Sequence, residues 1–145
     1  MTQMCEQGQC VAFVGQWSVW LVKGQVDSTT SSGEAWDLYN PFAGEAPDPY
    51  VAIGILGETF IDGTSETVDD TTSPLWNENL GDYTAAEFVQ GILFNVRDTD
   101  GGGLFNLMGR CTLRGVVQAG TWMLMRSTGD CVGAVEFLEI RLVER

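Results

Sequence analysis

The chain has 145 residues, enough for one domain with a hydrophobic core, and no linker-like segment divides it. Its 20 acidic residues against 7 basic ones give a net charge of -13, which argues against nucleic-acid binding and against attachment to anionic lipid by charge alone. We find no apolar run long enough to span a membrane and no signal peptide. The ordinary apolar content and the five tryptophans predict a globular chain.

Residues 1–16 are expected to form an N-terminal lead-in packed on the domain, and residues 17–145 the single domain itself. The first ten residues look irregular, whereas runs rich in Val and Trp predict strands over 11–14 and 17–22. The polar segment 27–33 predicts a turn, followed by a long loop that ends at Asp48. Pro47 and Pro49 disfavour helix at that point, so we expect the next strand to begin at Val51.

The middle of the chain alternates short strand patterns with turn residues. We expect a strand over 51–56, a hairpin-type turn at Asp62 and Gly63, and a return strand over 66–70. Residues 83–90 are expected to be a short helical or irregular crossing. The alternation of apolar and polar residues over 92–97 then predicts a half-buried strand, and the glycines at 101–103 predict a loop after it.

The C-terminal third continues the same pattern. Strands are expected over 111–117, 121–125 and 134–143, with Leu138, Ile140 and Leu142 facing the core in the last of them. About eight short strands without helical periodicity predict an all-β fold, an antiparallel eight-stranded β-sandwich.

Acidic side chains stand at the ends of two of these expected strands. Asp98 and Asp100 are two residues apart and should lean the same way at a strand end that faces solvent, and Asp48 precedes another strand. An all-β fold can bring such loops together around a hard cation, and calcium takes six to eight oxygen ligands from irregular loops. The alternative is that these aspartates only form turns through bonds to nearby backbone.

Three motifs together resemble the C2 domain family. They are Asp48-Pro49-Tyr50-Val51, Ser73-Pro74-Leu75-Trp76-Asn77-Glu78 and Val96-Arg97-Asp98-Thr99-Asp100, in the family's order and spacing, and the resemblance covers about residues 17–143. It implies a C2-like β-sandwich that binds calcium. The metal ligands implied are Asp37, Asp48, Asp98, Thr99, Asp100 and Asn106, with Glu45 as the competitor of Asp37 in the first loop.

The resemblance also implies a membrane partner. Calcium held between the loops would accept phosphate oxygens of anionic phospholipid, while apolar residues at the loop tips enter the headgroup region. The candidate membrane-contact residues are Phe42, Leu104 and Phe105, with Leu38 and Tyr39 beside them. Alternatively, these side chains fold onto the core. The chain has one lysine, so any lipid affinity must come through the cation.

Four cysteines permit three pairings if all are oxidised. We favour Cys5–Cys10, which brackets a short polar turn, and Cys111–Cys131, which brackets two late segments. Free thiols and a zinc site are the alternatives, although neither spacing is the close pair usual in zinc sites. Disulfides favour a secreted, periplasmic or cell-surface location. The resemblance also implies peripheral association with a membrane.

Two functional classes follow for this sequence. The first is calcium-dependent binding to phospholipid membranes, and the second is a calcium-stabilised protein-interaction or adhesion domain of a secreted or surface protein. We do not expect an enzyme: paired carboxylates could suit glycoside hydrolysis, but the chain has no histidine for a nucleophile-and-base arrangement, and the aspartates are better explained as ligands.

Overall fold

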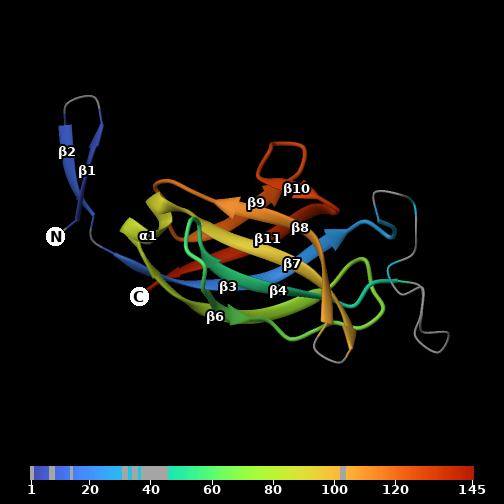
Figure 1. Cartoon of the computed structure of the whole chain (residues 1–145). Helices are drawn as coiled ribbons and strands as arrows, with labels where there is room; N and C mark the ends of the chain where they lie inside the picture. The colour runs from blue at the N-terminus through green and yellow to red at the C-terminus, as the bar shows by residue number, and fades with distance from the viewer. Residues whose placement is uncertain are drawn as a thin grey trace.

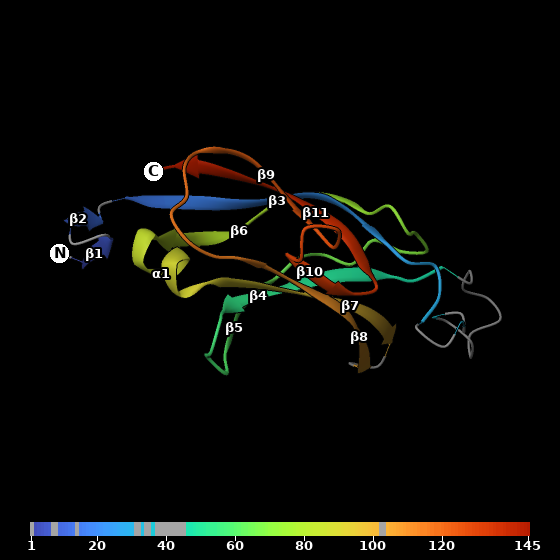
Figure 2. The same ribbon diagram turned by 90° about the horizontal axis from the view of Figure 1, so that it is seen from above.

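The computed structural model describes residues 2–6, 9–13, 15–30, 33, 36, 46–101 and 104–145, with side chains over 15–30, 33, 36, 46–99 and 105–145. Within these residues, two antiparallel sheets lie face to face (Figures 1 and 2). The five-stranded sheet runs in the order β10 (Cys131–Gly133), β8 (Leu104–Leu113), β7 (Ile92–Gly101), β4 (Pro49–Ile55) and β5 (Ile61–Thr64). The four-stranded sheet runs β6 (Leu75–Thr84), β3 (Gln16–Val26), β11 (Val135–Glu144) and β9 (Gly120–Met125).

The core lies between the sheets and follows the period of two that the sequence shows. Along β7, Ile92, Phe94 and Val96 are fully buried, and the residues between them are partly exposed. In β11, Leu138, Ile140 and Leu142 face the same core, as predicted. Because both sheets bury one face and expose the other, the all-β sandwich is confirmed; the two sheets hold nine strands among the described residues, where eight were expected.

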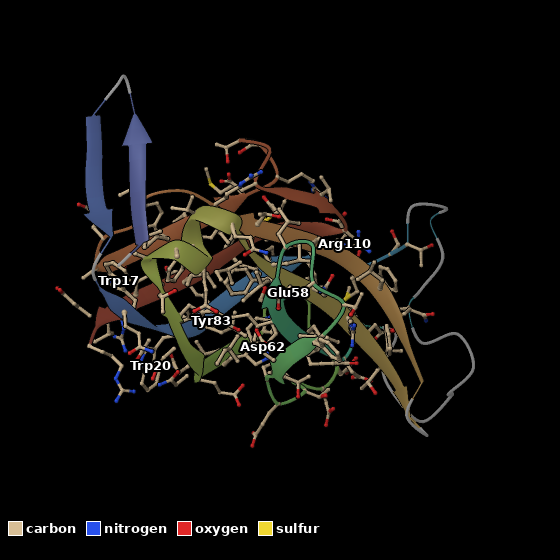
Figure 3. The ribbon with its side chains drawn as sticks, turned by 60° about the vertical axis from the view of Figure 1, so that its left-hand side comes forward. Trp17, Trp20, Glu58, Asp62, Tyr83 and Arg110 are labelled. Carbon is tan, nitrogen blue, oxygen red and sulfur yellow. A yellow bond between two sulfur atoms is a disulfide. The ribbon has the colours of Figure 1, made fainter. Side chains whose placement is uncertain are left out.

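One short helix, α1 (Ala85–Gln90), closes one end of the sandwich between β6 and β7 (Figure 1). It begins with a capping box, because the Thr84 hydroxyl accepts from the Glu87 backbone N–H while the Glu87 carboxylate accepts from the Thr84 N–H. Phe88 is fully buried and packs edge-on against Trp17 and Tyr83, which are labelled in Figure 3, with ring centroids 5.9 and 6.2 Å from its own. The predicted short helical crossing is therefore confirmed.

The first ten residues were expected to be irregular, and for residues 2–6 and 9–10 that expectation is wrong, whereas the strand predicted over 11–14 is confirmed for residues 11–13. Strands β1 (Thr2–Glu6) and β2 (Gln9–Phe13) form an antiparallel hairpin in which the backbone of Cys5 lies opposite that of Cys10. Figures 1 and 2 show this hairpin beyond the end of the two sheets rather than on a face of either.

The region after β4 also differs from the expectation. The chain reverses at Leu56 and Gly57, where Gly57 has a left-handed φ of 89°, and Asp62 and Gly63 lie within β5. Residues 66–70 form no strand; Asp70 has a φ of 52°, which an extended strand does not allow. The segment therefore follows β4 through separate hydrogen bonds instead of a regular ladder.

A disulfide joins Cys111 of β8 to Cys131 of β10, as predicted. The two strands approach closely, since a Cβ on Gly109 would lie 2.4 Å from the Val132 carbonyl oxygen. The position of the short strand β10 thus depends on Gly109, and the disulfide fixes β10 to the edge of the five-stranded sheet. The pairing of Cys5 with Cys10 stays a prediction.

Candidate metal centre

Asp48 directly precedes β4 and Asp98 lies near the end of β7, and a hydrogen bond joins them at one rim of the sandwich. Figure 1 shows this end of β4 and β7 opposite α1. The Asp48 backbone N–H donates to Asp98 Oδ1 at 2.8 Å, and the Thr99 N–H donates to the Asp48 carbonyl oxygen at 3.2 Å. These bonds continue the antiparallel register of β4 and β7, in which Pro49 is opposite Asp98. Two motifs 50 residues apart in sequence therefore form one structural unit.

Asp98 does not face solvent, and that part of the expectation is wrong. It continues the inward face of Ile92, Phe94 and Val96, and its exposed fraction is 0%. The reason is that β7 does not end at the aspartate but runs on to Gly101, so the alternation of the strand carries Asp98 inward. A buried carboxylate requires compensation by hydrogen bonds or a cation, and the Asp48 amide supplies one such bond.

A third segment reaches the same rim. The Asp70 N–H donates to Asp48 Oδ1 at 2.6 Å, and the Thr71 N–H donates to the Pro47 carbonyl oxygen at 2.8 Å. The sequence reasoning missed Asp70 because it placed residues 66–70 in a strand. The signal that could have found it is the run from Asp69 to Pro74, which is rich in turn-forming residues.

Two core residues hold this third segment against β4. The Ser65 hydroxyl accepts from the Val51 N–H at 2.8 Å, and the Trp76 indole N–H donates to the Glu66 carbonyl oxygen at 3.0 Å. Trp76 is buried. Since a buried indole that bonds to backbone leaves the segment little freedom, the position of Asp70 beside Asp48 is fixed by packing.

The β8 side of the rim carries Asn106 and Phe105. Asn106 lies opposite Asp98 in the register of β7 and β8, and Phe105 lies opposite Thr99. Phe105 is 45% exposed, and the Arg97 guanidinium carbon lies 4.0 Å from the centre of its ring. Phe105 therefore belongs to the rim surface rather than to the core.

Several predicted residues fall outside what the structure describes. They are Asp37, Glu45 and Phe42, together with Leu38 and Tyr39, all in the first loop. The backbones of Asp100 and Leu104 lie in β7 and β8, but their side chains are outside the described part. Of the six predicted ligands, the structure brings Asp48, Asp98, Thr99 and Asn106 to one rim.

The donors at this rim suit a hard cation. Carboxylate, amide, hydroxyl and carbonyl oxygens are the ligands that calcium takes, and no thiol or imidazole is present among them. Within the described side chains, no three acidic, cysteine or histidine residues gather closely enough to hold a metal ion. The described oxygens thus fit part of a calcium site, and the remaining charge would have to come from Asp37 and Asp100.

Comparison with known proteins places the chain in a structural context. A family model described as "C2 domain" matches residues 27–123. No curated protein sequence matches the chain. In addition, no helix in the described residues has the length and apolar character needed to cross a membrane.

Solved structures share this fold at low identity. A C2 domain of plant extended synaptotagmin 1 is 19% identical, with a TM-score of 0.65, over 93% of this chain and 97% of that one. Human GIVD cytosolic phospholipase A2 is 14% identical, with a TM-score of 0.62, and the match covers 92% of this chain but 17% of the enzyme. A calcium-bound pair of C2 domains from extended synaptotagmin 2 is 15% identical, with a TM-score of 0.53, over 90% of this chain and 46% of that one. These likenesses establish the β-sandwich fold.

Proposed function

The chain belongs to the C2 domain family, and from this premise we propose that it is a non-catalytic module that binds calcium at the Asp48–Asp98 rim and, through it, anionic phospholipid membranes. Members of the family in general bind calcium and phospholipids, and one solved protein of similar fold is described as calcium bound. The observation that carries the proposal is the bond of 2.8 Å between Asp48 and Asp98.

The proposed ligands have distinct tasks. Asp48 and Asp98 hold negative charge at a fixed place, because backbone N–H groups of Asp70 and Asp48 orient their carboxylates. Asn106 stands where an acidic residue is usual in the family. Its amide oxygen can coordinate calcium but brings no charge, so the affinity for calcium should be lower than with a full aspartate set. Calcium, when bound, would supply the positive charge that attracts lipid phosphate.

The first test is a thermal melt with and without calcium. Calcium that binds only the folded state should stabilise it by roughly 2.7 kcal/mol at a hundredfold excess over Kd, and a chelator should reverse the effect. The double variant Asp98→Asn, Asp100→Asn should melt at the same temperature in both conditions, since asparagine keeps an acceptor oxygen for the Asp48 amide but removes the charge.

A matched control removes the same charge elsewhere. Glu139→Gln with Glu144→Gln alters β11 in the four-stranded sheet, so this variant should respond to calcium as the wild type does. Equal wild-type melting curves with calcium and with chelator would overturn the calcium proposal.

The second test is sedimentation with vesicles that contain anionic phospholipid. The wild type should pellet with calcium and stay in solution with chelator, because a chain of net charge -13 is repelled by the bare surface. Phe105→Ser should weaken pelleting, whereas Val143→Ser should not: the two side chains are 45% and 42% exposed, but Val143 lies in β11, away from the rim.

The second candidate function is a calcium-stabilised interaction or adhesion domain of a secreted or surface protein. The Cys111–Cys131 disulfide favours it, because such bonds persist in oxidising compartments. Stabilisation by calcium without pelleting at any calcium concentration would select this candidate over membrane binding.

A further inference from the structure

Among the described residues, the two sheets of the sandwich end in four edge strands, and three of these are protected against pairing with another strand. β6 carries Glu78 and Asp82 and pairs with β3 through two register shifts, and both features hinder the addition of a strand. β5 has four residues, and its Asp62 accepts from Tyr83 of β6, so this edge is bonded to the other sheet. β10 has three residues and is held by the disulfide.

β9 is the edge strand that lacks such protection. Its six residues, Gly120–Met125, include no charged residue and no proline, and they pair with β11 without a register shift (Figure 1). Residues 101–129, which contain β9, form the longest stretch of the chain without aspartate or glutamate. Because a regular, uncharged edge is a template for another strand, natural sheets rarely leave one open. The edge of β9 is therefore a candidate interaction surface.

The direction in which each β9 residue forms hydrogen bonds follows from the ladder with β11. Arg126, the residue after β9, donates its N–H to the Glu136 carbonyl oxygen at 2.9 Å. In an antiparallel pair only alternate residues exchange bonds with the neighbouring strand, so Trp122 and Leu124 also bond to β11. The N–H and C=O groups of the odd-numbered residues of β9 therefore point to the open side of the strand.

This open side is limited at both ends of β9. Asp130 bonds to both groups of Met125, because its carboxylate accepts from the Met125 N–H at 3.4 Å and its own N–H donates to the Met125 carbonyl oxygen at 3.0 Å. At the other end the chain can bend at Gly120, whose φ is 127°. Between these limits, no hydrogen bond from a described residue reaches the outward N–H and C=O groups of Thr121 and Met123.

The side chains beside the open groups are apolar or already paired. Met123 is 41% exposed on the outer face of the sheet. Trp122 packs against the core but stays partly exposed, because no strand lies beyond β9. Arg126, the charged residue next to β9, is paired with Asp27 at 2.8 Å. A second strand placed along β9 would therefore cover apolar surface and meet no unpaired charge at this edge.

We infer that β9 pairs with β9 of a second copy of this chain, antiparallel and about a two-fold axis at Trp122. Thr121 of each copy would lie opposite Met123 of the other, so every open N–H and C=O group of both copies would be bonded. The two Trp122 residues would form the closely spaced, non-hydrogen-bonded pair at the centre, where aromatic pairs stabilise antiparallel strands. The two four-stranded sheets would become one continuous sheet.

A second copy suits this edge better than an unrelated strand. The Asp130 bonds and the bend at Gly120 leave room for only a short pairing, and a two-fold pair uses all of the open groups on both sides. In the resulting rows of side chains, Glu139 of one copy would lie in line with Arg141 of the other, across the two β9 strands. The pairing thus brings unlike charges toward each other, although each chain has a net charge of -13.

The pairing should be weak, because the strand is short and the contact is smaller than the roughly 1,200 Å² of a standard interface. The test is therefore an NMR dilution series of the 15N-labelled full chain in chelator, from about 1 mM to about 0.02 mM. The amide signals of Thr121, Trp122 and Met123 should shift with concentration. In a mixture of labelled and unlabelled chains, an intermolecular NOE between the two Trp122 Hα atoms should identify the two-fold register, since these atoms face each other in a non-hydrogen-bonded pair.

Met123→Lys should weaken the association at least tenfold, because a lysine on an open edge hinders strand pairing. Leu75→Lys is the matched control: Leu75 is 60% exposed in β6, at the opposite edge of the same sheet, so this variant should associate as the wild type does. Both variants lower the negative charge equally, so a general charge effect would strengthen association in both. The dispersion of their spectra should show both to be folded.

Three results would overturn the inference. The first is that the β9 amide signals do not depend on concentration up to about 1 mM. The second is that Leu75→Lys weakens association as much as Met123→Lys. The third is that the intermolecular NOEs connect other segments and not the two β9 strands. The inference depends on neither calcium nor membrane binding.

Discussion

Tyr83 connects the two sheets by a side-chain hydrogen bond. Its ring is 4% exposed in β6, and its hydroxyl donates to Asp62 Oδ2 in β5 at 2.9 Å (Figure 3). Burial, then the bond to Asp62, raises the pKa of Tyr83 well above the usual 10.0. The folded state therefore favours the neutral phenol.

The expected consequence is a loss of stability in alkali. Below pH 10.0 both states keep the phenol protonated and the stabilisation is complete; above it the unfolded chain loses the proton first, so the free energy of unfolding falls as pH rises. From pH about 8 to about 11, the wild type should lose up to about 1 kcal/mol more than Tyr83→Phe, which cannot ionise. At pH about 8 the variant should be less stable by about 1 kcal/mol, the usual contribution of one hydrogen bond. Urea unfolding of both proteins measures this, and parallel losses in alkali would refute the assignment.

Asp98 shows what the sequence can predict about a single residue. Its place near a second aspartate could be predicted, because the three motifs recur together in one family. Its burial could also have been read by continuing the alternation of β7, but the glycines at 101–103 suggested an earlier strand end. The hydrogen bond between the Asp98 carboxylate and the Asp48 backbone N–H could not be predicted, because it depends on the register of two strands from distant parts of the chain.

At the scale of elements, strands were predicted correctly where burial of one face makes apolar residues alternate with polar ones, and wrongly where no such alternation exists. The strands β7 and β11 each bury one face, so their alternation is plain in the sequence. The composition of segment 66–70 is compatible with a strand. Its actual position depends on hydrogen bonds made by Ser65, Trp76 and Asp70 to distant parts of the chain, which the local sequence does not show. The β1–β2 hairpin stands beyond the sandwich, and of its two strands the sequence indicated only the second, through the apolar run that begins at Val11.

The disulfide is the element-scale feature with the largest expected effect. Cys111 and Cys131 are 20 residues apart, so closing this loop should remove about 3 kcal/mol of chain entropy from the unfolded state. The double variant Cys111→Ala, Cys131→Ala should therefore unfold at lower denaturant, by about that free energy, and reduction of the wild type should have a similar effect.

The control is the double variant Cys5→Ser, Cys10→Ser in the N-terminal hairpin. Because that hairpin lies beyond the sheets, the unfolding of the sandwich should change by less than about 1 kcal/mol. If both double variants lose the same stability, the effect does not come from the fixing of β10 to β8.

At the scale of the whole molecule, period-two alternation predicts an antiparallel sandwich but not which strands are neighbours. The order β10-β8-β7-β4-β5 brings together strands from both halves of the chain, and this order places the Asp48 and Asp98 motifs side by side. Local sequence patterns do not show which strands are neighbours. Only the joint occurrence of the three motifs indicated that the Asp48 and Asp98 motifs lie close together. The extra strand β10 has three residues, too few to show a period.

The net charge of -13 leads to the last prediction, which concerns the whole chain without calcium. Like charges in the folded state repel one another, and salt screens this repulsion, so the melting temperature in chelator should rise with sodium chloride. Between about 0.02 and 0.5 M salt the Debye length falls from roughly 20 to 4 Å, and we expect a rise on the order of a few degrees. Screening of the exposed Arg126–Asp27 pair acts in the opposite direction, but such pairs contribute little.

This measurement also separates general screening from a specific cation site. At a constant ionic strength set by sodium chloride, calcium should raise the melting temperature further, and magnesium less, because magnesium requires a stricter octahedral shell than irregular loops supply. The increment from calcium should disappear in Asp98→Asn, Asp100→Asn, whereas the rise with sodium chloride should persist, since that variant still carries a net charge of about -11. A melting temperature that is independent of sodium chloride would mean that the acidic residues are spaced widely enough to avoid mutual repulsion, so that the net charge does not lower the stability of the folded chain.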